Sequence, residues 1–141
     1  MTPAQLSTFK TAILANAASY NIADHGSITA WFNTSSGAGF YWRSLIPIAE
    51  LNTAIVWTEF AALSALLQTT YMAMITAGAV DATSANIRGG FSTVFLGTSL
   101  TNLTALAKRV PTRLEALFTN ANVCSLTGTC SNTDVAAALA S

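Results

Sequence analysis

Charged side chains are scarce in this chain. Asp, Glu, Lys and Arg make up only 9% of its 141 residues, whereas about a quarter is usual in soluble domains. Six basic and six acidic residues give zero net charge, so the chain lacks the repulsion that keeps free proteins apart in solution. Hydrophobic residues reach 52%. This composition is typical of a subunit whose surface is covered by neighbouring chains, and it disfavours a nucleic-acid partner.

Cysteine and histidine are also few, with two cysteines and one histidine. Cys124 and Cys130 have no further cysteine or histidine near them, so they cannot complete a tetrahedral zinc site. Across a short hairpin the two sulfur atoms could come within disulfide range, and the sequence leaves a disulfide and two free thiols equally open. His25 lies in the turn-forming segment Asp24–Ser27. We interpret it as a surface turn residue and not as a catalytic base.

The sequence contains no pattern that indicates catalysis. The carboxylates are dispersed, and no pair has the spacing of a general acid and base or of a metal cage; they are Asp24, Glu50, Glu59, Asp81, Glu115 and Asp134. No phosphate-binding loop, nucleophile elbow or dinucleotide fingerprint is present. We therefore expect a protein that is not an enzyme and that has no cofactor, metal or small-molecule substrate.

The longest uncharged run, Phe60–Val80, is the segment around which the rest is expected to fold. As one helix it would be about 30 Å long, which is enough to cross a bilayer. However, Gln68, Thr69 and Thr70 lie at its midpoint, where a bilayer tolerates polar groups least. Its large apolar residues also recur at helical spacing. The pattern favours a buried core helix over 60–77, ended by Gly78, and disfavours a membrane span.

The rest of the sequence predicts a mainly α fold, with five to seven helices packed around this central one in a single domain over 1–141. A capping box at Thr2–Gln5 starts a first helix that runs to about Asn16. Further helices are expected over 28–33, 48–55, 85–96, 99–109 and 112–118. The helical part covers 1–120, and residues 121–141 form a small hairpin over 123–130, with Gly128 in its turn, and a last helical turn capped by Thr133 or Asp134. Gly89 and Gly90 lie inside a predicted helix and indicate close approach of another helix or chain.

Basic and aromatic residues supply the candidate interface. Most of the positive charge lies in one region, which contains Arg88, Lys108, Arg109 and Arg113. Ion pairs with glutamates are favoured there over contacts with nucleic acid. Trp57 is expected in the core, whereas Trp42 beside Arg43 is expected to contact a neighbouring chain. The interface candidates are Trp42, Arg43, Arg88, Arg109 and Arg113.

Several stretches in the same order resemble a family of small, uncharacterised proteins that tailed bacteriophages and prophages encode among their virion genes. The stretches are 41–47 (YWRSLIP), 56–59 with 62–63 (VWTE and AL), 85–91 (ANIRGGF), 107–109 with 112–118 (AKR and TRLEALF) and 134–139 (DVAAAL). Together they span residues 41–139, which is most of the chain, in the same order. The resemblance implies a phage origin and a component of the particle, and it supplies no catalytic residues.

These observations predict a non-enzymatic structural subunit of a tailed-phage virion, made in the bacterial cytoplasm and placed in the tail, the neck or on the capsid. Its expected partners are copies of itself and other virion proteins. One alternative is a small membrane-active lysis protein, similar to a holin, that uses Phe60–Val80 as its span. Another is a cytosolic accessory protein that binds a host factor.

Overall fold

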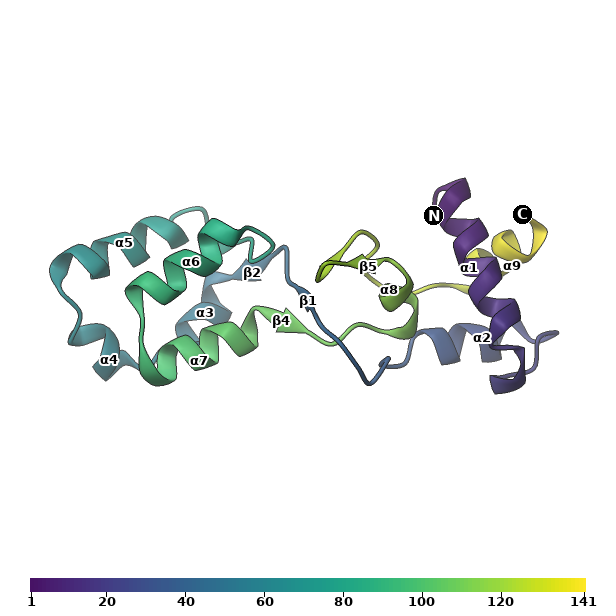
Figure 1. Ribbon diagram of the computed structural model, residues 1–141, viewed down its shortest axis with the longest axis horizontal. Helices are drawn as coiled ribbons and strands as arrows, with labels where there is room; N and C mark the ends of the chain where they lie inside the picture. Colours follow the sequence, from purple (N-terminus) through teal and green to yellow (C-terminus); the bar gives the residue numbers. More distant parts are fainter. The chain divides into compact units, whose positions relative to one another are not determined.

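Two separate hydrophobic cores divide this mainly helical chain. The computed structural model describes residues 1–141 (Figure 1). Helices account for 57% of the chain and number nine, and the strands are short antiparallel pairs, so the predicted mainly α class is confirmed. Unit 1 comprises residues 1–41 and 110–141, and unit 2 comprises residues 42–109. The sequence predicted one core around 60–77, whereas the structure has two. The assignment of residues 1–141 to a single domain stays a prediction.

Unit 1 is built from both ends of the chain. Its elements are α1 (Pro3–Ala15), the 3-10 helix η1 (Ala17–Ser19), α2 (His25–Phe32), α8 (Arg113–Leu117), β5 (Thr119–Asn120), β6 (Val123–Cys124) and α9 (Asn132–Ala140). Helix α9 packs against α1 and α2. Phe9 and Phe32 meet edge to face at the centre of this core, with ring centroids 4.9 Å apart. The buried core residues are Phe9, Ile13, Ile28, Phe32, Leu114, Cys130, Val135 and Ala138.

Reciprocal side-chain caps start three helices of unit 1. The predicted box of Thr2 and Gln5 is confirmed. The same arrangement joins Thr112 to Glu115 at α8 and Ser131 to Asp134 at α9. Each cap satisfies amide groups that a helix start leaves without partners. The prediction of a single last helical turn was wrong, since α9 is a nine-residue helix capped by Ser131.

Helix α2 also starts earlier than predicted, because Asp24 caps it. Its side chain accepts a hydrogen bond from the backbone N–H of Gly26 at 2.9 Å. His25 is therefore the first residue of α2 and does not lie in a free turn.

Unit 2 contains five helices and most of the aromatic core. Its elements are β2 (Ile46–Pro47), α3 (Ile48–Ala54), α4 (Trp57–Ala61), α5 (Ala65–Ile75), β3 (Ala79–Val80), α6 (Ala85–Val94), α7 (Gly97–Leu106) and β4 (Lys108–Arg109), and β1 (Tyr41–Trp42) ends inside it. Strands β2 and β3 are antiparallel, with Ile46 opposite Val80. Helix α5 packs on α6, and α3 packs on α7. The buried core residues are Ile46, Leu51, Ile55, Tyr71, Ile75, Val80, Ala82, Phe91, Val94, Phe95, Leu103 and Ala107.

The expected helix over 60–77 is two helices, α4 and α5, with a break at 62–64. Ser64 causes the break, because its side chain accepts a hydrogen bond from the N–H of Leu67 and starts a new helix. The side chain of Gln68 then donates to the carbonyl groups of Phe60 and Leu63, at 3.2 and 3.3 Å. These bonds satisfy carbonyl groups that the end of α4 exposes.

The candidate membrane span Phe60–Val80 is divided among the end of α4, α5 and β3. No helix of the structure is both long enough and apolar enough to cross a membrane.

The C-terminal hairpin is present but begins earlier than predicted. Thr119 pairs with Cys124 and Asn120 pairs with Val123. Ala121 and Asn122 form the turn, both at positive φ, as two-residue hairpin turns of this kind require. Gly128 was therefore wrongly placed in the turn, and it lies in the loop between β6 and α9.

The glycine pair of α6 has two different surroundings. A Cβ atom on Gly90 would lie 2.7 Å from the methyl carbon of Met74 on α5, so this glycine allows the predicted close approach of a helix. A Cβ atom on Gly89 would meet nothing within 4 Å.

We expect Gly89→Ala to raise the free energy of unfolding by about 0.5–1 kcal/mol, because alanine loses less backbone entropy in a helix. Gly90→Ala is the matched control. Its stabilisation should be smaller or become a loss, because the new methyl group would clash with the Met74 side chain. Urea unfolding of the two variants checks this. Equal stabilisation by both would show that α5 and α6 are not in close contact at Gly90.

Candidate interaction surface

Helix α5 is apolar on both of its faces, although only one is covered within unit 2. Tyr71 and Ile75 are buried on the inner face, with Leu67 and Met74 packed against the same core. The outer face is exposed and consists of Ala65, Leu66, Thr69, Met72, Ala73 and Thr76. Leu66 is 74% exposed and Met72 is 54% exposed. A helix that is hydrophobic all round is normally buried, so we call these six residues the α5 outer face and treat it as the candidate site.

The two threonines of the α5 outer face, Thr69 within α5 and Thr76 at its C-cap, do not make this surface strongly polar. The hydroxyl group of Thr69 donates to the carbonyl of Ala65 at 2.8 Å, and that of Thr76 donates to the carbonyl of Met72 at 2.9 Å. Their donors are satisfied within the helix, as is common for threonine at such positions. The methyl groups of these side chains therefore contribute to an apolar surface.

Charge is absent from the segments around this face. No Asp, Glu, Lys or Arg occurs in residues 60–80 or in residues 89–107, which supply α5, most of α6 and all of α7. Glu59 is the acidic residue closest in sequence to α5 on its N-terminal side. A surface of this kind offers no ion pairs to a charged partner.

An apolar pocket lies beside the α4–α5 connection. It has a volume of about 400 Å³ and is lined by Glu59, Ala62, Leu63, Leu67, Thr93, Val94, Phe95, Leu96 and Gly97. Leu96 is 76% exposed at this place. Figure 1 shows the two connections that border it, α4 to α5 and α6 to α7, at the same end of unit 2.

Glu59 has a structural task at the rim of this pocket. Its carboxylate accepts hydrogen bonds from the backbone N–H groups of Thr98 at 3.1 Å and Ser99 at 2.8 Å, which caps α7. Hydrogen bonds from the side chain and backbone of Ser99, followed by those from Thr98, lower the pKa of Glu59 below its ordinary value of 4.5.

The stabilisation by Glu59 is expected to depend on pH. Because its folded pKa lies below the unfolded one, the contribution is complete above about pH 4.5 and is lost as the pH falls through the folded value. We expect Glu59→Gln to be less stable than the wild type at pH 7 and to lose less stability between about pH 5 and pH 3. Urea midpoints measured over this range test the assignment. Parallel curves for the two proteins would contradict a charged cap.

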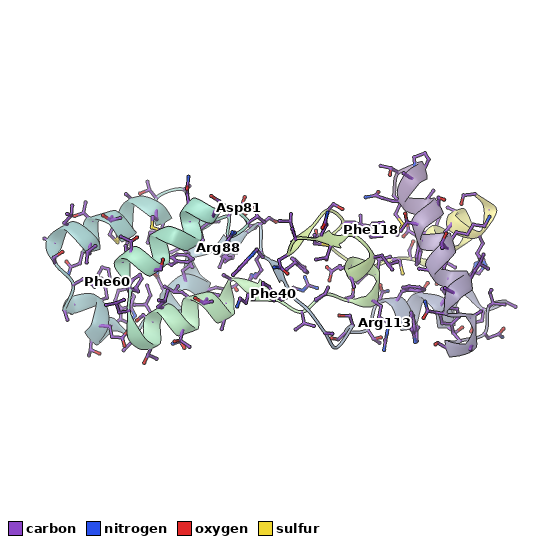
Figure 2. All side chains as sticks on the ribbon, viewed as in Figure 1. Phe40, Phe60, Asp81, Arg88, Arg113 and Phe118 are labelled. Carbon is purple, nitrogen blue, oxygen red and sulfur yellow. The ribbon has the colours of Figure 1, made fainter.

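The predicted basic and aromatic candidates mostly make contacts inside their own unit. The guanidinium group of Arg88 lies over the Trp42 ring, 4.6 Å from its centroid, and the ammonium group of Lys108 lies 5.3 Å from it. Arg88 also donates to the carbonyl groups of Ala82 and Thr83, both at 2.7 Å. Arg88 lies at the end of unit 2 opposite Phe60 (Figure 2).

Arg43 and Arg113 are likewise engaged. Arg43 forms a two-pronged ion pair with Glu50, at 2.6 and 3.0 Å. Hydrogen bonding from Arg43 lowers the pKa of Glu50. In unit 1, Arg113 lies over the ring of Trp31 at 4.4 Å and donates to its carbonyl at 3.2 Å.

Among the candidates, the structure brings together Trp42, Arg88 and the neighbouring Lys108. Arg109 is exposed in β4, and Arg113 belongs to the other unit. A role of these candidates in contacts with other chains stays a prediction.

The two cysteines are free thiols in the structure. The sulfur atom of Cys124 lies 3.0 Å from the carbonyl oxygen of Leu126, and that of Cys130 lies 3.5 Å from the side-chain oxygen of Asn33. Burial raises the pKa of Cys130 to about 11. No group of three or more His, Cys, Asp or Glu residues is placed to hold a metal ion.

Sequence reasoning missed the exposed apolar residues. Trp57 was expected in the core but is 54% exposed. It occupies the first position of the short helix α4, and its ring contacts that of Phe60 edge to face. Leu66, Met72 and Leu96 were not among the candidates. The available signal was the lack of charge in 60–80 and 89–107, combined with apolar residues on every side of α5.

Comparison with protein-family models, curated proteins and solved structures found no match to this chain.

Proposed function

We propose that this protein is a non-enzymatic structural subunit of a tailed-phage virion, which assembles through apolar surfaces in the tail, the neck or on the capsid. The observation that carries the proposal is the α5 outer face. It exposes leucine and methionine on an uncharged helix whose other face is already buried. Exposed apolar surface of this kind marks a site of association with another protein, a membrane or a ligand.

The use of the carboxylates supports a structural role. Asp24, Glu59 and Asp134 cap helices. Glu50 pairs with Arg43, and Asp81 accepts from the backbone and hydroxyl of Thr83. Glu115, the sixth carboxylate, accepts from the backbone N–H groups of Thr112 and Gly128. A catalytic acid or base needs a group free to exchange protons with a substrate, whereas these groups are engaged in helix caps, a turn and an ion pair.

The phage origin rests on the resemblance of the stretches from 41–47 to 134–139 to small proteins encoded among virion genes. Virion parts repeat one subunit by symmetry, so a single interface recurs many times in a ring or lattice. A short apolar face is sufficient in that setting, because each subunit is held by several neighbours at once.

Mass spectrometry of purified particles from the phage or prophage that carries the sequence tests this function. We expect the protein in the particles at a fixed ratio to the other tail or neck proteins, after washing in high salt. Its absence from particles would reject the proposal. Recovery with the inner membrane would instead support the lysis-protein alternative, and recovery with a host protein would support the accessory-protein alternative.

A further inference from the structure

We infer that the α5 outer face is a two-fold interface at which two copies of this chain pair helix against helix. This inference rests on the proposed function and names one of the contacts through which the subunit assembles. The face is defined by six exposed residues, Ala65, Leu66, Thr69, Met72, Ala73 and Thr76.

The arrangement of these residues is that of a helix-packing stripe. At 100° per residue, they lie within an arc of about 120° around the helix axis. Thr69 lies near the middle of the arc, with alanines or threonines at most of the remaining positions. Small residues at the centre of a helix face allow a second helix backbone to approach closely.

Leu66 and Met72 make the face complementary to itself. Each lies three residues from Thr69, on opposite sides along the helix. A two-fold axis at Thr69, perpendicular to α5, places Leu66 of each copy against Met72 of the other, and Ala65 against Ala73. The largest exposed side chains of the face then pack against one another around a centre of small residues. This is the geometry of an isologous contact, in which one patch serves both subunits.

The lack of charge disfavours nucleic acid, an anionic membrane and a charged protein as partners, whereas a second copy of the same face fits it. A nucleic acid or an anionic membrane surface is attracted by lysine and arginine, and the segment 60–80 has neither. A charged protein partner would lose the hydration of its charges at this face without gaining ion pairs. The same face on another copy has no charge to desolvate. Since α5 has only 11 residues, the pair alone buries less area than a stable dimer needs, so we expect micromolar affinity.

Sedimentation velocity on the full chain tests the pairing. The wild type should pass from monomer to dimer between about 1 and 100 µM, and Leu66→Glu should weaken the pairing at least tenfold, as expected for a charge placed in an apolar contact. Leu45→Glu is the matched control, because Leu45 is 67% exposed in the same unit but lies outside α5. Circular dichroism confirms that both variants fold. A wild type that stays monomeric throughout, or equal effects of both variants, would overturn the inference.

Cross-linking tests the axis without perturbing the packing by a charge. In a Cys124→Ser background, Thr69→Cys should form a disulfide-linked dimer on mild oxidation, since residues on a two-fold axis meet their own copies. Thr101→Cys is the matched control. Thr101 is also exposed, and its hydroxyl bonds the carbonyl four residues earlier, as that of Thr69 does. Equal cross-linking at both positions would contradict the axis.

Two outcomes separate this inference from the proposed function. If particles contain the protein and still incorporate Leu66→Glu at the wild-type ratio, the α5 pairing fails while the virion function stands. If the protein pairs through Thr69→Cys but is absent from particles, the interface stands and the virion function fails. Binding of a monomeric chain to phosphatidylcholine vesicles would overturn the pairing and assign the face to lipid.

Discussion

Tyr71→Ala is expected to lower the free energy of unfolding by about 3–5 kcal/mol, the usual cost of removing a large buried side chain. Tyr71 is only 1% exposed. Its ring meets Phe60 at 5.7 Å and Phe95 at 5.2 Å between centroids, both edge to face. Alanine would remove both aromatic contacts and leave a cavity between α4, α5 and α6. Urea unfolding followed by tryptophan fluorescence measures the loss.

Two matched variants show whether this loss belongs to the inner face of α5. Tyr71→Phe removes only a long hydrogen bond to Asn52, at 3.4 Å, and should cost less than about 1 kcal/mol. Met72→Ala changes the adjacent residue on the outer face. Measured in the dilute monomer, it should change stability by no more than about 0.5 kcal/mol. Equal losses from Tyr71→Ala and Met72→Ala would contradict the division of α5 into a buried and an exposed face.

Glu115→Ala is expected to lower the free energy of unfolding more than the replacement of any other polar side chain in unit 1. Glu115 is fully buried. Its carboxylate accepts hydrogen bonds from the N–H of Thr112 and the N–H of Gly128, both at 2.9 Å, and from the hydroxyl of Tyr41 at 3.2 Å. The bond to Tyr41 is buried and those to Thr112 and Gly128 are partly buried. A fully buried donor left without its partner costs about 1–3 kcal/mol and a partly buried one less, so we expect a total loss of about 4 kcal/mol.

The neighbouring cap provides the control for Glu115. Thr112→Ala removes the other half of the same capping box, in which the Thr112 hydroxyl accepts from the N–H of Glu115 at 3.2 Å. It should cost only about 1 kcal/mol. Glu115→Gln keeps one acceptor oxygen and should fall between the two. A loss for Glu115→Ala no larger than that for Thr112→Ala would show that the carboxylate does not hold Gly128 and Tyr41 in place.

Local signals in the sequence were sufficient for several helix starts. Thr2 and Gln5 have the spacing of a capping box. Pro47 lies directly before α3, where a proline is tolerated because the first residues of a helix need no N–H partner within the helix. Such signals depend on residues three or four apart, so they are legible without the fold. Ser64 carries a similar signal, but the apolar run around it conceals the boundary between α4 and α5.

The two cores could not be predicted from local pattern. Unit 1 joins α1 and α2 to α8 and α9, which are separated from them by all of unit 2. Leu114 and Val135 share a core with Phe9 for this reason. Hydrophobic spacing shows which face of a helix is buried but not which distant helix buries it.

The candidate surface was missed for a related physical reason. Periodicity assigns a buried face only where polar residues mark the opposite one, and α5 has apolar residues on both sides. Leu66 and Met72 therefore cannot be distinguished from Leu67 and Tyr71 by residue type. Conversely, Trp42 is of a type favoured at interfaces, yet in the folded unit it packs under Arg88.

Methyl NMR of the three methionines in the presence of a soluble paramagnetic reagent tests the central claim most directly, because it reports whether the α5 outer face is covered. Met74 is packed against the core of unit 2 and should be shielded at every protein concentration. Met72, 54% exposed in the single chain, should be broadened by the reagent in dilute samples and become shielded as concentration rises. If Met72 remains equally broadened at all concentrations and within assembled particles, the face is not an interface, and the account given for it is wrong.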